Sequence, residues 1–262
     1  MNSIITKELD ISYDDTVIVS NMELDIKKGK ITSIIGPNGC GKSTVLKAIG
    51  RILRPKKGLI LLSGEDIKNL STKEIATKMA ILPQTPTAPS GLTVGELVAY
   101  GRFPHQKGFG KLTPKDKEII SWALKVTKLT DYEDREVDTL SGGQRQRVWI
   151  AMALAQQTDL ILLDEPTTYL DMSHQMEVLE LLYELNITQG CTIVMVLHDL
   201  NLAARFSDIM IAMRNGKIIK QGGPKEVMNL EVLKEAFHVE AQIVEDKKSN
   251  RPICLTYDLI KD

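Results

Sequence analysis

The chain has few cysteines, almost no net charge and no long apolar run, and each of these absences excludes a class of protein. Three cysteines in 262 residues are an odd number, which indicates a reducing compartment and not a disulfide framework. A formal net charge of −1 predicts no strongly basic face, so nucleic acid is not an expected partner. No apolar run approaches the roughly 20 residues of a membrane span, and the first residues lack the apolar centre of a signal peptide. We therefore expect the chain itself to stay in the cytoplasm.

The chain does contain a glycine-rich loop, GPNGCGKST, at residues 36–44. It follows the apolar residues 31–35, which predict a buried strand, and precedes residues 45–49, which predict a helix. This order indicates a phosphate-binding loop, because the loop N–H groups and the positive end of the helix dipole both face an anion. We expect Lys42 to reach the β- and γ-phosphates of a nucleotide and Ser43 to ligate Mg²⁺.

Two carboxylates close a second apolar segment. Residues 160–163, LILL, predict a strand buried on both faces, as in a parallel sheet, and Asp164 and Glu165 follow directly. The C-terminal end of such a strand lies over the ligand crevice of an open α/β sheet. We expect Asp164 to hold Mg²⁺ through water, opposite Ser43, and Glu165 to orient or deprotonate an attacking water.

A third motif runs from Leu140 to Gln144. Ser141 and Gln144 form a capping box at a predicted helix start, and the two glycines between them allow a phosphate or another backbone to approach closely. A second anion site remote from the first is explained most economically if the two sites belong to opposite protomers that share one nucleotide. An ordinary capped helix is the alternative that this stretch alone leaves open.

The predicted elements divide the chain into a core and an insertion. Strand patterns surround the phosphate loop up to residue 84; separate strands are expected at 16–19 and 22–27, and in the second Met22, Leu24 and Ile26 share one face. Capping boxes are predicted at Ser71 and Thr93, and helical patterns fill residues 85–157. Strands alternate with helices again over residues 158–262, where the apolar run 192–197 predicts another buried strand. We expect an α/β fold: a nucleotide-binding core with an antiparallel β subdomain, made of residues 1–84 and 158–262, and an inserted helical subdomain at 85–157.

Four motifs occur together in one order: GPNGCGKST, LSGGQRQR, LILLDEPTTYLD and VLHD. In that order they resemble the nucleotide-binding subunits of ABC transporters across essentially the whole chain. The resemblance implies a single ABC ATP-binding domain on a RecA-like P-loop NTPase core, with ATP and Mg²⁺ as cofactors. It also implies a head-to-tail pair of cassettes, most simply a homodimer. ATP would lie between the phosphate loop of one subunit and the signature of the other, here meaning residues 140–147.

The resemblance also implies roles for single residues. It implies that Tyr13 stacks on adenine, that Gln84 contacts Mg²⁺, the attacking water and the membrane subunits, and that His198 contacts the γ-phosphate. Asp171 is implied in communication across the dimer. Taken singly, Tyr13 is more often a half-buried strand aromatic, Gln84 a polar loop residue and His198 a residue at the entry to a helix. The implied catalytic residues are Glu165, His198 and Gln84, and the implied Mg²⁺ ligands are Ser43, Gln84 and Asp164. The other implied ATP-binding positions are Gly36, Pro37, Asn38, Gly39, Cys40, Gly41, Lys42, Ser43, Thr44, Ser141, Gly142, Gly143 and Gln144.

Two stretches narrow the resemblance to one branch. Residues 100–106, YGRFPHQ, and 167–175, TTYLDMSHQ, look like the importers of ferric siderophores, haem and cobalamin. This implies an ATP-hydrolysing subunit that powers uptake of a ferric siderophore or related iron chelate through separate permease subunits, with a substrate-binding protein as an indirect partner. The chain would sit peripherally at the cytoplasmic face of the membrane. We expect Phe103 to lie on the permease-facing surface; a loop-stabilising proline turn is the alternative.

Two other functions fit parts of the sequence. A soluble ABC-type ATPase switch is the main alternative, but such proteins normally carry two cassettes or a long coiled coil, and this sequence has one cassette and no heptad stretch. A P-loop small-molecule kinase offers no reason for the signature. Finally, Cys40 lies among loop N–H groups that could lower its pKa, so we expect its thiol to be alkylated in the free protein and shielded by MgATP.

Overall fold

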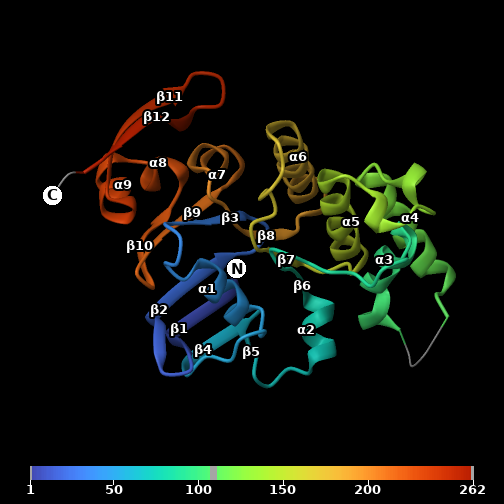
Figure 1. Ribbon diagram of the computed structural model, residues 1–262. Coiled ribbons are helices and arrows are strands. Elements are labelled where there is room, and N and C mark those ends of the chain that lie inside the picture. Colours follow the sequence, from blue (N-terminus) through green and yellow to red (C-terminus); the bar gives the residue numbers. More distant parts are fainter. Residues whose placement is uncertain (1, 107–110, 261–262) are drawn as a thin grey trace.

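The computed structural model describes residues 2–106 and 111–260. Its centre is a six-stranded sheet with the order β10-β9-β3-β8-β7-β6, in which the pairs β9–β3, β3–β8, β8–β7 and β7–β6 are parallel and β10 is antiparallel (Figure 1). The strands are β3 (Ile31–Ile35), β6 (Met79–Leu82), β7 (Leu160–Leu163), β8 (Thr192–Val196), β9 (Ile209–Arg214) and β10 (Lys217–Gly222). Every residue of β3, β7 and β8 is buried, which confirms the prediction of strands covered on both faces.

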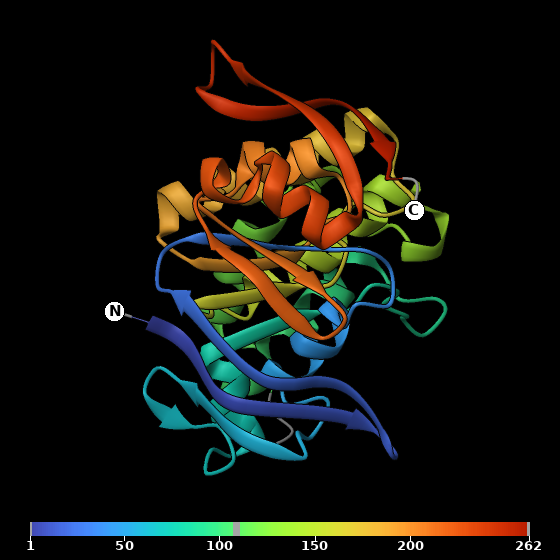
Figure 2. The ribbon, with the colours of Figure 1, turned by 90° about the vertical axis from the view of Figure 1, so that its left-hand side faces the viewer.

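A second, antiparallel sheet lies beside α1 (Lys42–Ile49), below the main sheet in Figures 1 and 2. Its order is β2-β1-β4-β5. The strands are β1 (Asn2–Tyr13), β2 (Thr16–Lys27), β4 (Lys57–Leu62) and β5 (Glu65–Asp66). The predicted alternation is confirmed in β2, where Met22, Leu24 and Ile26 are buried while Glu23 and Lys27 are exposed.

One detail of this sheet differs from the sequence-based prediction of separate strands at 16–19 and 22–27. The structure has one continuous strand, β2, with a register shift against β1 between Val19 and Met22. Asn21 takes a left-handed conformation (φ 49°), and its N–H donates to Asp10 Oδ1 at 2.7 Å. Asparagine tolerates this conformation, so the chain passes through a bulge and continues in the same strand.

The elements that the structure describes between β6 and β7 are helices. They pack on one another at the right of Figure 1, and two of them, α3 and α4, open with capping boxes at Thr93 and Thr113. They are α3 (Val94–Ala99), η1 (Tyr100–His105), α4 (Pro114–Val126), η2 (Thr130–Tyr132), η3 (Val137–Thr139) and α5 (Gly142–Ala155). The remaining helices are α2 (Thr72–Lys78), α6 (Met172–Gln189), α7 (Leu200–Phe206), α8 (Pro224–Val227) and α9 (Leu230–Phe237).

The main sheet separates two apolar cores. Alternate residues of β7 face opposite sides, so Ile161 and Leu163 join the core shared with α3 to α7, while Leu160 and Leu162 join the core shared with α1 and the antiparallel sheet. Because the two cores pack against opposite faces of the same strands, the C-terminal ends of those strands are held firmly in place.

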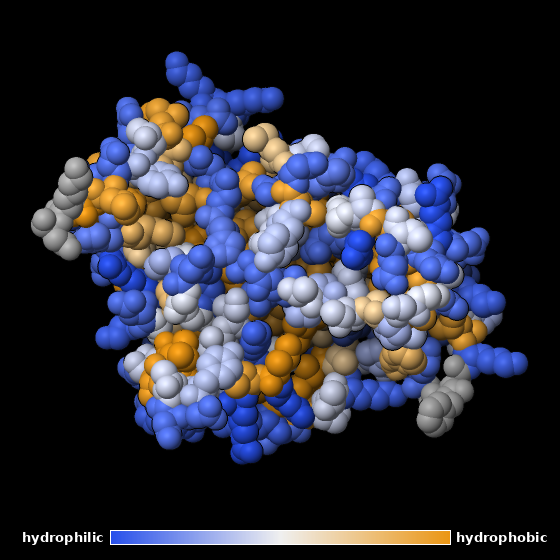
Figure 3. Space-filling model, viewed as in Figure 1, coloured by the Kyte–Doolittle hydropathy of each residue, from blue (hydrophilic) through white to orange (hydrophobic). Residues whose placement is uncertain are grey.

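The chain ends in a hairpin of β11 (Val239–Asp246) and β12 (Arg251–Leu259), which packs against α7 and α9. Figure 3 shows apolar surface at the left, where Figure 1 places α9 and this hairpin. Leu255, Tyr257 and Leu259 of β12 are exposed. Within residues 2–106 and 111–260 we find no helix with the length and apolarity needed to cross a membrane.

Candidate nucleotide site

The candidate site lies where the parallel strands β3, β6, β7 and β8 end. A pocket of about 640 Å³ opens at this edge of the sheet, and the segments that follow the four strands line it. Ligands of open α/β sheets bind at this position because the loops and helix N-termini converge there. The predicted site residues in the lining are Asn38, Gly39, Gly41, Lys42, Ser43, Thr44, Gln84, Glu165 and His198.

The phosphate loop is wound tightly between β3 and α1. Gly36 has φ 154°, and a Cβ there would lie 2.4 Å from the carbonyl oxygen of Met213 and 2.7 Å from Cys40 Sγ, so only glycine fits. Lys42 Nζ donates to the carbonyls of Gly36 (2.9 Å) and Pro37 (3.0 Å), which places the ammonium group inside the loop. The loop therefore presents a positive charge and the N-terminus of α1 to the pocket.

Ser43 and Asp164 meet beside the loop. The Ser43 hydroxyl donates to Asp164 Oδ1 at 2.7 Å, and Asp164 is only 5% exposed. Burial raises the pKa of Asp164 and the neighbouring charge of Glu165 adds to this, while the Ser43 hydrogen bond and nearby lysines oppose it. A hydroxyl and a buried carboxylate side by side form an oxygen donor set of the kind that suits Mg²⁺.

Glu165 is the point on which three other side chains converge. Its Oε2 accepts hydrogen bonds from Gln84 Nε2 at 2.5 Å and from the Thr168 hydroxyl at 3.0 Å, and its Oε1 lies 2.7 Å from His198 Nε2. The partners come from the ends of β6 and β8 and from the segment after β7. Glu165 itself has φ 55°, a left-handed conformation that is uncommon outside glycine, asparagine and aspartate and that it shares with eleven other non-glycine residues of the described chain.

Three groups of predicted site residues lie elsewhere. Within the described part of the chain, the pocket lining does not include Tyr13, the signature or Asp171. Tyr13 ends β1 and is 43% exposed. Ser141 caps α5 with the predicted capping box, and Asp171 caps α6.

The fold and this geometry agree with the comparisons to known proteins. Residues 19–168 match the family described as ABC transporter. The chain belongs to this family. It is 60% identical over all 262 residues to the iron(3+)-hydroxamate import ATP-binding protein FhuC of Bacillus subtilis, of which it covers 97%. It is 52% identical over 252 residues, 96% of its length, to the petrobactin import ATP-binding protein FpuD of Bacillus anthracis, of which it covers 92%.

A solved ABC transporter cassette shows the same fold. The dimeric structure of the bacterial cassette MJ0796 matches with a TM-score of 0.75 and 31% identity, over 84% of this chain and 98% of that one. The same cassette is known as a dimer in a post-hydrolysis state bound to ADP and Pi. The predicted α/β P-loop NTPase fold is therefore confirmed.

Three residues that line this ABC cassette's pocket escaped the sequence-based site assignment: Ile18, Thr168 and Tyr169. Thr168 reaches Glu165 through its hydroxyl, Tyr169 follows it in the chain, and Ile18 reaches the pocket from β2. Thr168 follows Glu165 by three residues, so a turn that brings the two together was a detectable signal. Ile18 offered none, because it reaches the pocket only through the packing of the antiparallel sheet.

The expectation of a reactive Cys40 is wrong. Cys40 is 3% exposed, its sulfur packs against Gly36, and it does not face the pocket. Burial raises the pKa of its thiol, and the positive charge and N–H of Lys42 only partly oppose this. The loop N–H groups do not outweigh the cost of burying a thiolate, so the Cys40 side chain packs inside the loop as an unreactive thiol.

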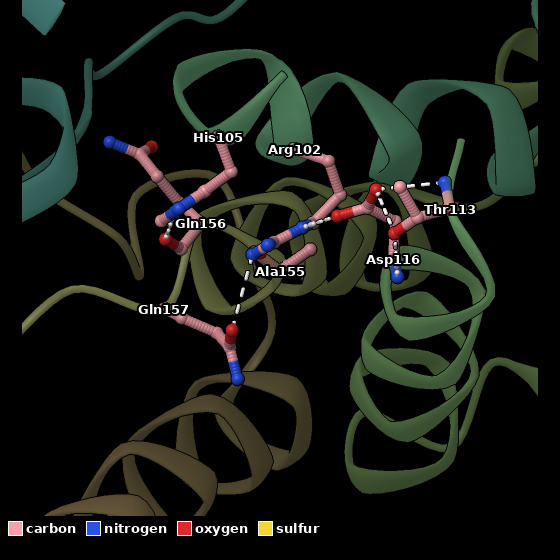
Figure 4. A network of polar contacts seen from close by, with 7 residues as sticks. All are labelled: Arg102, His105, Thr113, Asp116, Ala155, Gln156 and Gln157. Carbon is pink, nitrogen blue, oxygen red and sulfur yellow. Dashed lines mark hydrogen bonds and ion pairs between the residues drawn. The ribbon is translucent and has the colours of Figure 1, made fainter. Parts of the chain in front are cut away.

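The turn around Phe103 is exposed, as expected of a contact surface. Phe103 is 59% exposed, and its ring centroid lies 5.0 Å from that of Tyr100. Next to it, Arg102 points inward and is 4% exposed, with Nε donating to Asp116 Oδ1 at 2.8 Å and Nη1 to the carbonyl of Ala155 at 2.7 Å (Figure 4). The exposed turn is thus anchored to α4 and to the C-terminal end of α5.

Proposed function

We propose that this chain is the ATP-hydrolysing subunit of an importer of ferric siderophores. The observation that carries the proposal is 60% identity along the whole chain to an iron(3+)-hydroxamate import ATP-binding protein. The second relative is named for petrobactin, so we propose the class of ferric siderophores and not a single compound.

The site residues support a division of labour in hydrolysis. Lys42 and the loop N–H groups would bind the phosphates, and Ser43 and Asp164 would hold Mg²⁺, which neutralises charge on the β- and γ-phosphates when bound. Glu165 would accept the proton of the attacking water. Gln84, Thr168 and His198 hold the Glu165 carboxylate from three sides, so its lone pairs are aimed before the substrate arrives.

We further propose that two cassettes complete each other's sites. The signature, residues 140–147, and Asp171 lie outside the pocket of their own chain, which is the arrangement expected if they serve the pocket of a partner. The dimeric cassette MJ0796 supports this pairing. Residues 85–157 would form the subdomain that carries the signature. Permease subunits would dock near Phe103 and Gln84 and so hold the chain at the cytoplasmic face of the membrane.

The decisive experiment measures iron uptake and ATP hydrolysis together. We expect the purified protein to hydrolyse MgATP, and cells that carry only the Glu165→Gln variant to lose uptake of a radioactive ferric hydroxamate. Growth in excess inorganic iron is the control, because it shows whether the variant cells are impaired in anything other than iron acquisition. A soluble ATPase switch would hydrolyse ATP while the variant cells keep normal siderophore uptake, and that result would overturn the transport assignment.

A further inference from the structure

The signature and the start of α6 are in direct contact within one chain, as the neighbouring positions of α5 and α6 in Figure 1 show. A Cβ at Gly143 would lie 2.4 Å from His174 Cδ2 and 2.8 Å from its Cγ. The His174 imidazole therefore lies close against the second signature glycine, which is buried. A side chain at 143 would push the ring away, so the contact between α6 and the signature depends on this glycine.

The same imidazole holds Asp171. His174 Nδ1 lies 2.8 Å from Asp171 Oδ1. A carboxylate only accepts hydrogen bonds, so Nδ1 carries the proton and donates. Oδ1 also accepts from the His174 backbone N–H at 2.9 Å and from the Ser173 hydroxyl at 2.9 Å. These contacts lower the pKa of Asp171 to about 2, and the group is a fixed carboxylate in neutral solution.

A second contact reinforces the first further along the two helices. Arg147 of α5 forms an ion pair with Glu177 of α6. The helices are therefore joined at two points. The two contacts differ, because His174 touches both a signature glycine and Asp171, whereas the ion pair of Arg147 and Glu177 joins the helices further along.

We propose that His174 is a positioning residue that locks the signature to Asp171, so that a partner cassette meets both segments in one fixed geometry. The inference rests on the proposed function, because it assigns both segments to the surface between two cassettes. The physical reason is preorganisation: segments already fixed in the free subunit lose less conformational entropy when two cassettes close on ATP.

The test uses the Glu165→Gln protein, in which slow hydrolysis should allow an ATP-bound dimer to accumulate. Two quantities are measured: the dimer dissociation constant in saturating ATP by sedimentation, and the affinity of the isolated subunit for a fluorescent ATP analogue. We expect His174→Ala to weaken dimerisation by at least about tenfold. Binding of the analogue should change less than about twofold, because His174 does not line the nucleotide pocket.

Three matched variants separate positioning from general stability. Ser173→Ala removes another donor to the same Asp171 oxygen without touching the signature, and should leave dimerisation within about threefold. His174→Asn keeps a donor near the Nδ1 position, and His174→Phe keeps a ring against Gly143. Each should recover part of the loss caused by His174→Ala.

The outcomes are distinguishable. Unchanged dimerisation in His174→Ala would overturn the inference, and so would an equal loss in Ser173→Ala, which would mean that helix capping alone matters. A parallel loss of analogue binding and of thermal stability would also overturn it, because the residue would then be an ordinary packing element. If the Glu165→Gln protein with native His174 does not dimerise in ATP, the proposed function itself fails.

Discussion

At the scale of the residue, Glu165 combines features that rarely occur together in a side chain with only a structural role. Its carboxylate is 11% exposed, lies at the rim of the phosphate-loop pocket and is held by donors from three segments. Its backbone has a left-handed conformation, which costs free energy that the surrounding contacts must offset. Both features indicate that the position of this carboxylate matters more than its contribution to stability.

We therefore expect Glu165→Gln to retain ATP binding and to lose turnover by roughly 10²–10⁴-fold, because the amide keeps the shape but cannot accept the proton. Steady-state phosphate release and equilibrium binding of ATP measure the two quantities. Thr168→Ala is the matched control: it removes one hydrogen bond to Glu165, at 3.0 Å, and leaves the carboxylate in place, so it should cost much less. Turnover at the native rate in Glu165→Gln would exclude the residue as the base.

The buried Cys40 leads to a second prediction at this scale. We expect iodoacetamide at pH 8 to label Cys40 in the folded protein at least about tenfold more slowly than in the unfolded chain, with or without MgATP, because burial disfavours the thiolate. Peptide mapping by mass spectrometry distinguishes Cys40 from Cys191 and Cys254, whose thiol pKa values are also raised. Fast labelling that MgATP blocks would show that the loop opens in solution.

At the scale of the element, the buried pair of Arg102 and Asp116 fastens η1 to α4 and α5 (Figure 4). The Thr113 hydroxyl and the Arg102 guanidinium lower the pKa of Asp116 from 3.8 to about 2. A second polar contact also holds α5 in place: Gln156, at the end of this helix, donates hydrogen bonds to the carbonyls of Ala76 and Met79. The helices around α5 are therefore connected to the main sheet through polar contacts as well as apolar ones.

We expect Asp116→Asn to lower the free energy of unfolding by about 3 kcal/mol, because it leaves the Arg102 charge buried without a counter-charge. The double variant Arg102→Met with Asp116→Leu should recover most of this loss, since both charges are then absent. Urea unfolding at pH 7 measures both. A single variant as stable as the native protein would show that Arg102 gains solvent or another partner.

The lowered pKa of Asp116 also predicts an acid dependence. Its folded value lies below its ordinary value, so its contribution to stability is fully present above about pH 4 and is lost as the pH falls toward 2. We expect the native protein to lose stability more steeply than Asp116→Asn over this range, in urea unfolding at a series of pH values. If the free energy of unfolding falls equally steeply with pH in both proteins, the lowered pKa of Asp116 is contradicted.

At the scale of the whole molecule, the exposed turn at Phe103 is not part of the nucleotide pocket's lining, and its neighbour Arg102 anchors it to α5. This separation allows a membrane partner to bind without touching the phosphate loop. A permease bound at this turn can therefore change the rate of hydrolysis only if it contacts the open and closed forms of a cassette pair differently.

We expect Phe103→Ala to reduce siderophore uptake by about tenfold or more while the ATPase rate of the isolated subunit stays near the native value, because truncating a docked aromatic removes interface contacts only. Ile187→Ala is the matched control, since Ile187 is also about 60% exposed but lies on α6, away from the turn. ATPase assays in vesicles, with and without permease and loaded binding protein, measure the coupling. An equal loss in the isolated subunit would show that Phe103 is a packing element of the helical region.

The sequence by itself determined the local features of this protein. The continuous apolar runs predicted β3, β7 and β8, the glycine-rich loop predicted the phosphate site, and the capping boxes at Ser71, Thr93 and Ser141 appear where they were expected. These features depend on residues close together in the chain, so their hydrogen bonds and periodicity can be predicted without knowing the fold.

The tertiary structure alone decided which distant residues meet. Gln84 and Glu165 are 81 positions apart and touch because β6 and β7 are neighbours in the sheet, an order that no local pattern specifies. The burial of Cys40 and the packing of His174 on Gly143 were likewise invisible in the sequence. Each depends on the path of a second segment, and burial is a property of all the segments that surround a group, so the chemistry of a side chain follows from the fold that encloses it.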